Sequence, residues 1–116
     1  MHEYSIVQEL LSVAAVEARR AGAVRVTGLH CRIGALRQLD HRLLLEAFEL
    51  LRSETVCAEA ELRIETTFVT ARCGCCQHEY AVHDWNWDCP RCGGSGHPLG
   101  GGDELDLISL EAEIAA

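Results

Sequence analysis

The stretch CGCCQHEYAVHDWNWDCPRC (residues 73–92) contains two C-x-x-C pairs separated by twelve residues. Cys73 pairs with Cys76, and Cys89 with Cys92. Each pair forms a tight turn that directs two thiolates to one point, so two turns supply the four ligands of a tetrahedral Zn²⁺ site. Because thiolates fill all four positions, the pattern predicts a closed structural or regulatory zinc site and not a catalytic one.

Cys75 makes the identity of one zinc ligand ambiguous. It directly precedes Cys76, and by counting alone either thiol can serve in the first turn. We choose Cys73 and Cys76, because the C-x-x-C spacing is then repeated in both halves of the site. Cys31 and Cys57 lie outside the stretch, and we expect them to be small buried side chains.

The composition changes at the start of this stretch. Residues 73–102 contain five of the seven cysteines, both prolines, both tryptophans and seven of the ten glycines. Such a segment cannot build a conventional hydrophobic core, and metal binding would supply the missing folding free energy. Apolar alternation resumes after it in ELDLISLEAEI (residues 104–114). We therefore predict a zinc-ribbon-like domain inserted between two strands.

The segments around the insertion predict an α+β fold. Residues 5–21 and 40–52 show the apolar spacing of amphipathic helices, and Ser5 and Asp40 are placed to cap their N-termini. Two helices would then pack on a small three-stranded sheet. The three segments that alternate apolar and polar residues as half-buried strands do are residues 24–33, 61–69 and 104–114.

A division into domains follows from this pattern. Residues 1–69 form an α/β domain, residues 70–102 the inserted zinc-binding domain, and residues 103–116 the final strand, which returns to the first domain. We expect the strands on either side of the insertion to be antiparallel neighbours, because the insertion connects them as an elongated hairpin. So small a sheet leaves an exposed edge, which is compatible with a monomer or a weak homodimer.

The charge and hydropathy of the chain exclude several classes of protein. The net charge of −8 opposes binding to a nucleic-acid backbone or to an anionic membrane surface. No segment approaches the ~18 consecutive apolar residues of a membrane span, and the start does not have the pattern of a signal peptide. We therefore expect a cytoplasmic protein with reduced cysteines and with neither nucleic acid nor membrane as a partner.

The chain begins with Met1, His2 and Glu3. The Met1 amine, the His2 amide nitrogen and the His2 imidazole can chelate one metal in fused rings, and Glu3 can complete the site. This planar, nitrogen-rich geometry suits Ni²⁺ or Cu²⁺. The amide must lose its proton, so metal binding should weaken as the pH falls. Solvated end residues are the alternative interpretation.

Three motifs together resemble the hydrogenase nickel-incorporation factor family HypA/HybF. They are MHEYSIVQELL at the start, the twin C-x-x-C ending in CPRCGGSG, and GDELDLISLEAEI, so the resemblance covers essentially the whole chain. It implies a small metallochaperone and not an enzyme, with a nickel-binding α/β domain and a separate zinc-binding domain. The site residues that it implies are His2 as principal nickel ligand with Met1 and Glu3 beside it, and Cys73, Cys76, Cys89 and Cys92 as zinc ligands.

The resemblance also implies cofactors and partners. Zn(II) would be tightly bound by four thiolates, and Ni(II) would be a transient cargo. The partners would be the GTPase HypB and the large-subunit precursor of [NiFe] hydrogenase, and in some organisms urease maturation proteins. Cys75 is a departure from the family pattern and bears on the choice of ligand in the first turn.

Two other classes of function compete with this interpretation. A zinc-ribbon module that binds protein or nucleic acid would explain the cysteines but not the Met-His-Glu start, and the acidic charge opposes nucleic acid. A small enzyme would need a nucleophile with its base, an open metal position or a phosphate-binding loop. A phosphate-binding loop lies between a strand and a helix, and the glycines after Cys92 do not have this context.

Overall fold

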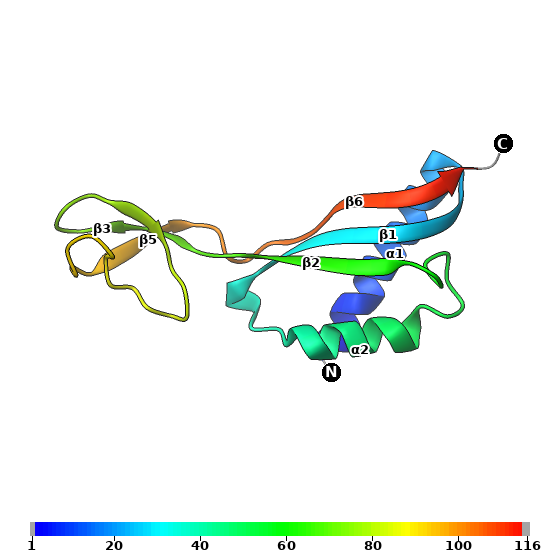
Figure 1. Ribbon diagram of the computed structural model, residues 1–116, viewed down its shortest axis with the longest axis horizontal. Helices are drawn as coiled ribbons and strands as arrows, with labels where there is room; N and C mark the ends of the chain where they lie inside the picture. The colour runs from blue at the N-terminus through cyan, green and yellow to red at the C-terminus, as the bar shows by residue number, and fades with distance from the viewer. Residues whose placement is uncertain (1, 115–116) are drawn as a thin grey trace. The chain divides into compact units, whose positions relative to one another are not determined.

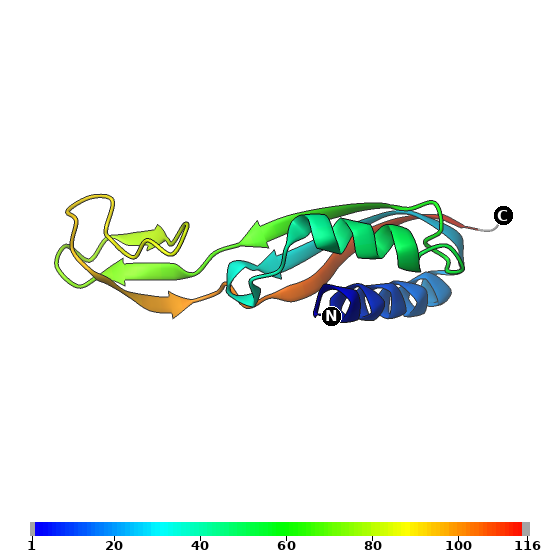
Figure 2. The same ribbon diagram turned by 90° about the horizontal axis from the view of Figure 1, so that it is seen from below.

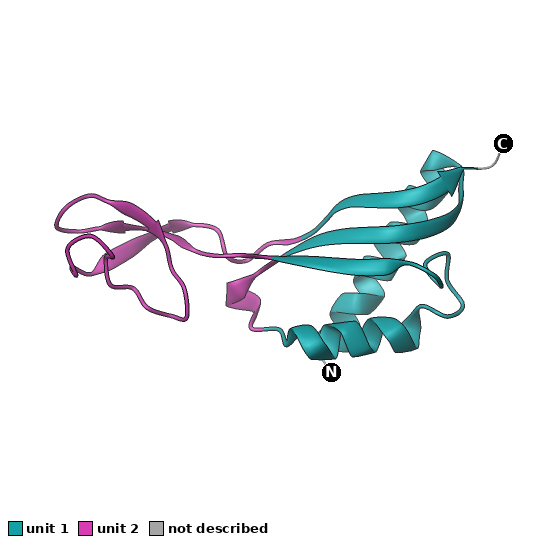
Figure 3. Cartoon of the chain, in the orientation of Figure 1, with its two compact units in different colours: residues 1–32, 39–65, 106–116 teal, residues 33–38, 66–105 magenta. Residues whose placement is uncertain are grey.

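The computed structural model describes residues 2–114. The chain forms two compact units, drawn in separate colours in Figure 3. The helical unit contains residues 1–32, 39–65 and 106–116. The cysteine unit contains residues 33–38 and 66–105. No helix among the described residues is long and apolar enough to cross a membrane.

Two helices and a three-stranded sheet build the helical unit, as the sequence predicts. The helices lie beside each other against the sheet (Figures 1 and 2). Their apolar stripes are buried, with Val7, Ala14 and Leu44 at 1% exposure or less. The elements are α1 (His2–Ala21), α2 (His41–Leu51), β1 (Ala23–Gly34), β2 (Glu61–Thr67) and β6 (Leu105–Ile114).

The helix caps match the prediction at α2 and differ from it at α1. Asp40 caps α2, because its Oδ1 accepts hydrogen bonds from the N–H groups of Arg42 at 2.8 Å and Leu43 at 3.2 Å. The expectation that Ser5 caps α1 is wrong, since the helix begins at His2 and Ser5 lies within its first turns. The apolar stripe that defines a helix starts at Ile6, so periodicity could not detect the polar turn before it.

The order of strands corrects another expectation. The order is β2-β1-β6, so the strands on either side of the insertion are separated by β1 and are not neighbours. β1 lies at the centre and is the most buried of the three strands, with Val26, Leu29 and Cys31 fully buried. β2 and β6 carry charged residues along their lengths, as edge strands commonly do.

An ion pair joins the two edge strands over Gly28 of the central strand. Arg63 of β2 donates to Glu111 of β6 at 2.7 Å, and a Cβ at Gly28 would lie 3.4 Å from the Glu111 carboxyl carbon. The Arg63 and Glu111 side chains thus meet over the face of β1 at a residue that has no side chain of its own.

The cysteine unit has its own three-stranded antiparallel sheet, in the order β4-β3-β5. Figure 1 labels β3 and β5. A 3₁₀ turn (Ala35–Arg37) belongs to this unit, because Leu36 donates to the Gly102 carbonyl at 2.7 Å. The strands are β3 (Thr70–Cys73), β4 (Glu79–Ala81) and β5 (Gly96–Gly100). The core is small: its buried residues are Val69, Ala71, Cys73, Tyr80, Val82 and Cys89.

Candidate metal centres

The structure brings the four cysteines of the C-x-x-C pairs together. Their Sγ atoms all lie within 4.8 Å of one another. Across the two turns, Cys73 Sγ lies 3.4 Å from Cys92 Sγ, and Cys76 Sγ lies 3.6 Å from Cys89 Sγ. A tetrahedron with Zn–S bonds of about 2.3 Å has edges of about 3.8 Å. The four thiols are therefore already arranged at the spacing that a tetrahedral thiolate site requires.

Backbone N–H groups in the two turns point at the sulfurs. The amides of Cys75 and Cys76 donate to Cys73 Sγ at 3.3 and 3.5 Å. Arg91 N donates to Cys89 Sγ, and Gly94 N donates to Cys92 Sγ, both at 3.4 Å. These bonds stabilise negative charge on the sulfurs, which is the protonation state that binds a metal.

The pKa values within the cluster differ strongly. The backbone amides of Cys76 and Cys75 lower the pKa of Cys73 to about 6. The Gly94 amide opposes a rise at Cys92, but the hydrogen bonds with the neighbouring thiols raise its pKa to about 12. The Cys73 thiol thus loses its proton easily, whereas the neighbouring Cys92 thiol resists this loss. A cation at the centre would remove this resistance, because it neutralises the charge of neighbouring thiolates.

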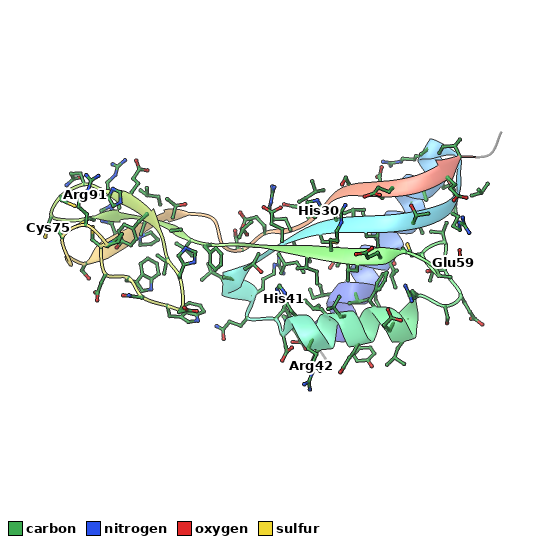
Figure 4. The ribbon with its side chains drawn as sticks, viewed as in Figure 1. His30, His41, Arg42, Glu59, Cys75 and Arg91 are labelled. Atoms are coloured by element: carbon green, nitrogen blue, oxygen red, sulfur yellow. The ribbon has the colours of Figure 1, made fainter. Side chains whose placement is uncertain are left out.

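Cys75 lies outside the cluster. Its side chain is exposed, and it is not among the four thiols that share the common centre. Figure 4 labels it in the loop after β3. A Cβ at Gly94 would lie 3.1 Å from Cys75 Sγ and also 3.1 Å from Cys73 Sγ, so a side chain at this position would crowd both sulfurs. The geometry favours Cys76 over Cys75 as the ligand.

Cys75 should be the reactive thiol of the folded, metal-loaded protein. Cys31 and Cys57 are fully buried, and burial raises the pKa of Cys31 to about 11, which leaves roughly 0.1% thiolate at pH 8. We expect iodoacetamide at pH 8 to add one carbamidomethyl group, detected by intact-mass spectrometry. Cys75→Ser should acquire none. Addition of two or more groups before the metal leaves would contradict this assignment.

The start of α1 lies beside the start of α2. His2 is exposed and is the first residue of α1, while Glu3 is half-buried. Glu3 Oε2 accepts a hydrogen bond from the Asp40 amide at 3.2 Å, which ties the two helix N-termini together. Met1, the third predicted nickel ligand, lies outside the described residues.

The helical conformation of His2 leaves its amide available. The first four N–H groups of an α-helix have no acceptor within the helix. The His2 amide is one of these, so it can lose its proton to the solvent and bind a metal without breaking a helical hydrogen bond. Sequence reasoning missed the contact between Glu3 and Asp40, because these residues are 37 positions apart and no periodic pattern connects them.

The histidines of the cysteine unit do not join the thiol cluster. His83 packs against Phe68 with 4.3 Å between ring centroids, and His78 stacks on Tyr80 at 6.2 Å. Among the described residues, the four cysteines are the one cluster of three or more His, Cys, Asp or Glu side chains that could hold a metal ion. The fold and this cluster define a class of small α+β proteins with an inserted four-cysteine metal-binding unit.

Comparisons with known proteins identify the family. The family described as "HypA: Hydrogenase/urease nickel incorporation, metallochaperone, hypA" matches residues 1–112. A hydrogenase maturation factor HypA of Wolinella succinogenes is 38% identical over 114 residues, covering 97% of this chain and 96% of the relative. That of Picosynechococcus sp. is 35% identical over 111 residues, covering 96% and 98%. The chain belongs to the HypA family.

A solved structure agrees with this assignment. The solution structure of the Ni metallochaperone HypA from Helicobacter pylori matches with a TM-score of 0.68 and 30% identity. The match covers 99% of this chain and 100% of that one. The sequence-based resemblance to HypA/HybF is thus confirmed, as is the α+β fold with two helices.

Proposed function

We propose that this protein is a nickel metallochaperone that binds Ni(II) at its N-terminus and delivers it for the maturation of [NiFe] hydrogenase. The observation that carries the proposal is the position of His2. It is exposed at the first turn of α1, where its amide is not needed by the helix. Membership of the HypA family supports the same role.

The proposed nickel ligands come from Met1, His2 and Glu3. The terminal amine, the His2 amide and the His2 imidazole provide nitrogens in adjacent chelate rings, a donor set that suits Ni²⁺. Glu3 contributes by its backbone or its carboxylate, and its hydrogen bond to the Asp40 amide holds this turn against α2. An exposed site of this kind lets a recipient exchange ligands one at a time, so nickel is a cargo and is not consumed by a reaction.

The proposed resident metal is Zn(II), held by Cys73, Cys76, Cys89 and Cys92. The sulfur spacing and the N–H groups directed at the sulfurs support this assignment. When bound, zinc would join the two turns of a unit whose core is too small to be stable alone. A closed thiolate site has no open position for substrate, which supports a role other than catalysis.

The remaining parts of the proposal concern domains and partners. Residues 1–69 together with the strand 103–116 would form the nickel-binding domain, and residues 70–102 would form the zinc-binding domain. We propose the GTPase HypB and the [NiFe] hydrogenase large-subunit precursor as partners in the cytoplasm, with urease maturation proteins where urease is present. The chain would act as a monomer or a weak homodimer, without nucleic acid. It contains no nucleotide-binding motif of its own, so any GTP dependence must come from a partner.

Deletion of the gene from the organism that encodes it tests this function. We expect [NiFe] hydrogenase activity to fall at least tenfold and to recover when excess nickel salt is added to the medium. The wild-type gene should restore activity without added nickel, whereas a gene carrying His2→Ala should not. If activity stays low in excess nickel, the protein is needed for a step other than nickel supply. If the deletion strain keeps its activity, the proposal is wrong.

A further inference from the structure

The cysteine unit contains a pocket of about 150 Å³ that the metal sites do not use. Three aromatic side chains line it, together with a carboxylate and apolar residues. These three are Phe68, Trp85 and Trp87, and the carboxylate belongs to Asp84. Leu36, from the 3₁₀ turn that packs into this unit, and Val82 contribute to the apolar part.

Trp85 adopts a backbone conformation that is unfavourable for its side chain. It occupies a two-residue turn in which Asn86 donates to the His83 carbonyl at 3.0 Å, and both central residues have positive φ, 52° at Asp84 and 62° at Trp85. Such a type I′ turn favours asparagine, aspartate or glycine, whereas a bulky residue is disfavoured there. The indole is 56% exposed, so burial within the chain does not compensate for this cost.

The other aromatic walls of the pocket are held in place. Trp87 is partly buried against the core of the unit, which includes Cys73 and Cys89, and its carbonyl accepts a hydrogen bond from the Tyr80 hydroxyl. Phe68 is 36% exposed and packs against the His83 ring. Phe68 and Trp87 thus have packing partners within the unit, and Trp85 is the most exposed of the three rings.

The charge at the rim indicates which ligand fits. Asp84 forms no ion pair with any residue in the described part of the chain. Aromatic faces attract cations through their quadrupole, and a nearby carboxylate adds direct attraction. An apolar occupant would desolvate Asp84 without pairing it, which is unfavourable. The net charge of −8 also favours a basic partner.

We propose that this aromatic and acidic pocket receives a cationic side chain, an arginine or a lysine, from a partner protein. The cation would lie against the indole and phenyl faces, with Asp84 as its counter-ion. The proposal is independent of nickel binding at the N-terminus. It gives Trp85 a role in binding, which accounts for a tryptophan at a position where asparagine would be less strained.

Titration with N-acetyl-arginine amide tests the proposal on the full, zinc-loaded chain. Trp85 and Trp87 are the two tryptophans of the sequence, so their indole N–H signals in NMR report on this pocket directly. N-acetyl-citrulline amide is the matched neutral probe, because it replaces the guanidinium with a urea of similar shape. We expect both indole signals to shift with arginine, and the citrulline probe to bind about fivefold more weakly. N-acetyl-lysine amide should behave like the arginine probe.

Two variants separate binding from folding. Trp85→Asn suits the turn, so its melting temperature should equal or exceed that of the parent, while the arginine-induced shift at Trp87 should disappear. Asp84→Asn should keep the turn and bring the arginine and citrulline affinities within about twofold of each other. Leu99→Asn is the control, since Leu99 is an exposed apolar residue of the same unit outside the pocket.

Three results would overturn the proposal. The first is equal affinity for arginine and citrulline in the parent, which would indicate an apolar pocket without preference for charge. The second is the absence of any indole shift with either cationic probe. The third is a Trp85→Asn variant that binds as the parent does, or that unfolds, because the ring would then be dispensable for binding or required for the fold.

Discussion

Replacing Cys76 with serine should remove the zinc from this protein and unfold residues 66–105, whereas replacing Cys75 should change neither. The two cysteines are adjacent, but of these two only Cys76 is among the four thiols that lie within 4.8 Å of one another. Metal analysis by mass spectrometry should find one zinc per chain in the parent and in Cys75→Ser. In Cys76→Ser it should find less than about 0.1.

The size of the effect on folding follows from the core of the cysteine unit. It contains six buried residues, two of which, Cys73 and Cys89, are themselves proposed ligands. A structural zinc site contributes about 10–16 kcal/mol to folding, which is more than so small a core can replace. Amide NMR signals from residues 66–105 should therefore collapse to the narrow range of an unfolded chain. Signals from α1 and β1 should remain dispersed.

Acid should release the zinc, and the direction follows from the pKa values. Zinc binds thiolates, so binding must displace the proton from Cys92, whose pKa the neighbouring thiols raise to about 12. Lowering the pH favours the protonated thiols and weakens zinc binding. If Cys75→Ser loses zinc and Cys76→Ser retains it, the ligand assignment in the first turn is reversed. If both variants retain it, four-thiolate coordination is wrong.

The spacing of cysteines predicted this cluster correctly because the C-x-x-C turn is local. Four residues determine the direction of each pair of thiols, and only the meeting of the two turns depends on the rest of the unit. The cap at Asp40 was predictable for the same reason, since its partners Arg42 and Leu43 follow it directly. Local chemistry of this kind can be read from one segment at a time.

The order of strands could not be predicted in the same way. Alternation shows which face of a strand is buried, but it does not identify the neighbouring strand. The expected hairpin around the insertion would have left β1 at an edge, with fully buried Val26 and Leu29 in an exposed position. The sheet instead places its most buried strand at the centre. Apolar content does not identify this strand either, because the edge strand β6 has as many apolar residues as β1 in a shorter segment.

The aromatic pocket combines segments that sequence analysis treated separately. Leu36 follows the first strand, Phe68 precedes the cysteines, and Trp85 lies between the two C-x-x-C pairs. The turn at His83–Asn86 has no glycine to mark it, and Trp85 is a residue that turn propensities exclude from positive φ. A residue that contradicts local preference and is exposed is the kind of position where function can be sought.

Replacing His2 with alanine should abolish high-affinity nickel binding and leave zinc in place. The His2 imidazole closes one chelate ring of the proposed site, and its loss leaves only the amine, backbone and carboxylate donors. We expect the Kd for Ni(II), measured by isothermal titration calorimetry on the untagged chain, to rise at least 100-fold. His97→Ala is the control, because His97 is also exposed but lies in β5 of the cysteine unit.

The terminal amine can be tested chemically, because the sequence contains no lysine. An acetylating reagent that attacks primary amines therefore finds only the amine of Met1. Acetylation should reduce nickel affinity as strongly as His2→Ala, although every side chain of the metal site is retained. Glu3→Ala should have a smaller effect on affinity, since its carboxylate is already engaged with the Asp40 amide.

The pH dependence distinguishes amide coordination from binding by the imidazole alone. A site that uses the imidazole alone exchanges one proton for the metal, so its affinity falls by at most tenfold per pH unit. A site that also uses the amine and the ionised His2 amide must return protons to these groups, so its affinity falls more steeply, by more than tenfold per pH unit between pH 8 and 6. A slope below tenfold would show that nickel binds without the ionised His2 amide. Full affinity both after acetylation and in His2→Ala would show that nickel binds elsewhere, and the start of the chain would then serve only as the first turn of α1.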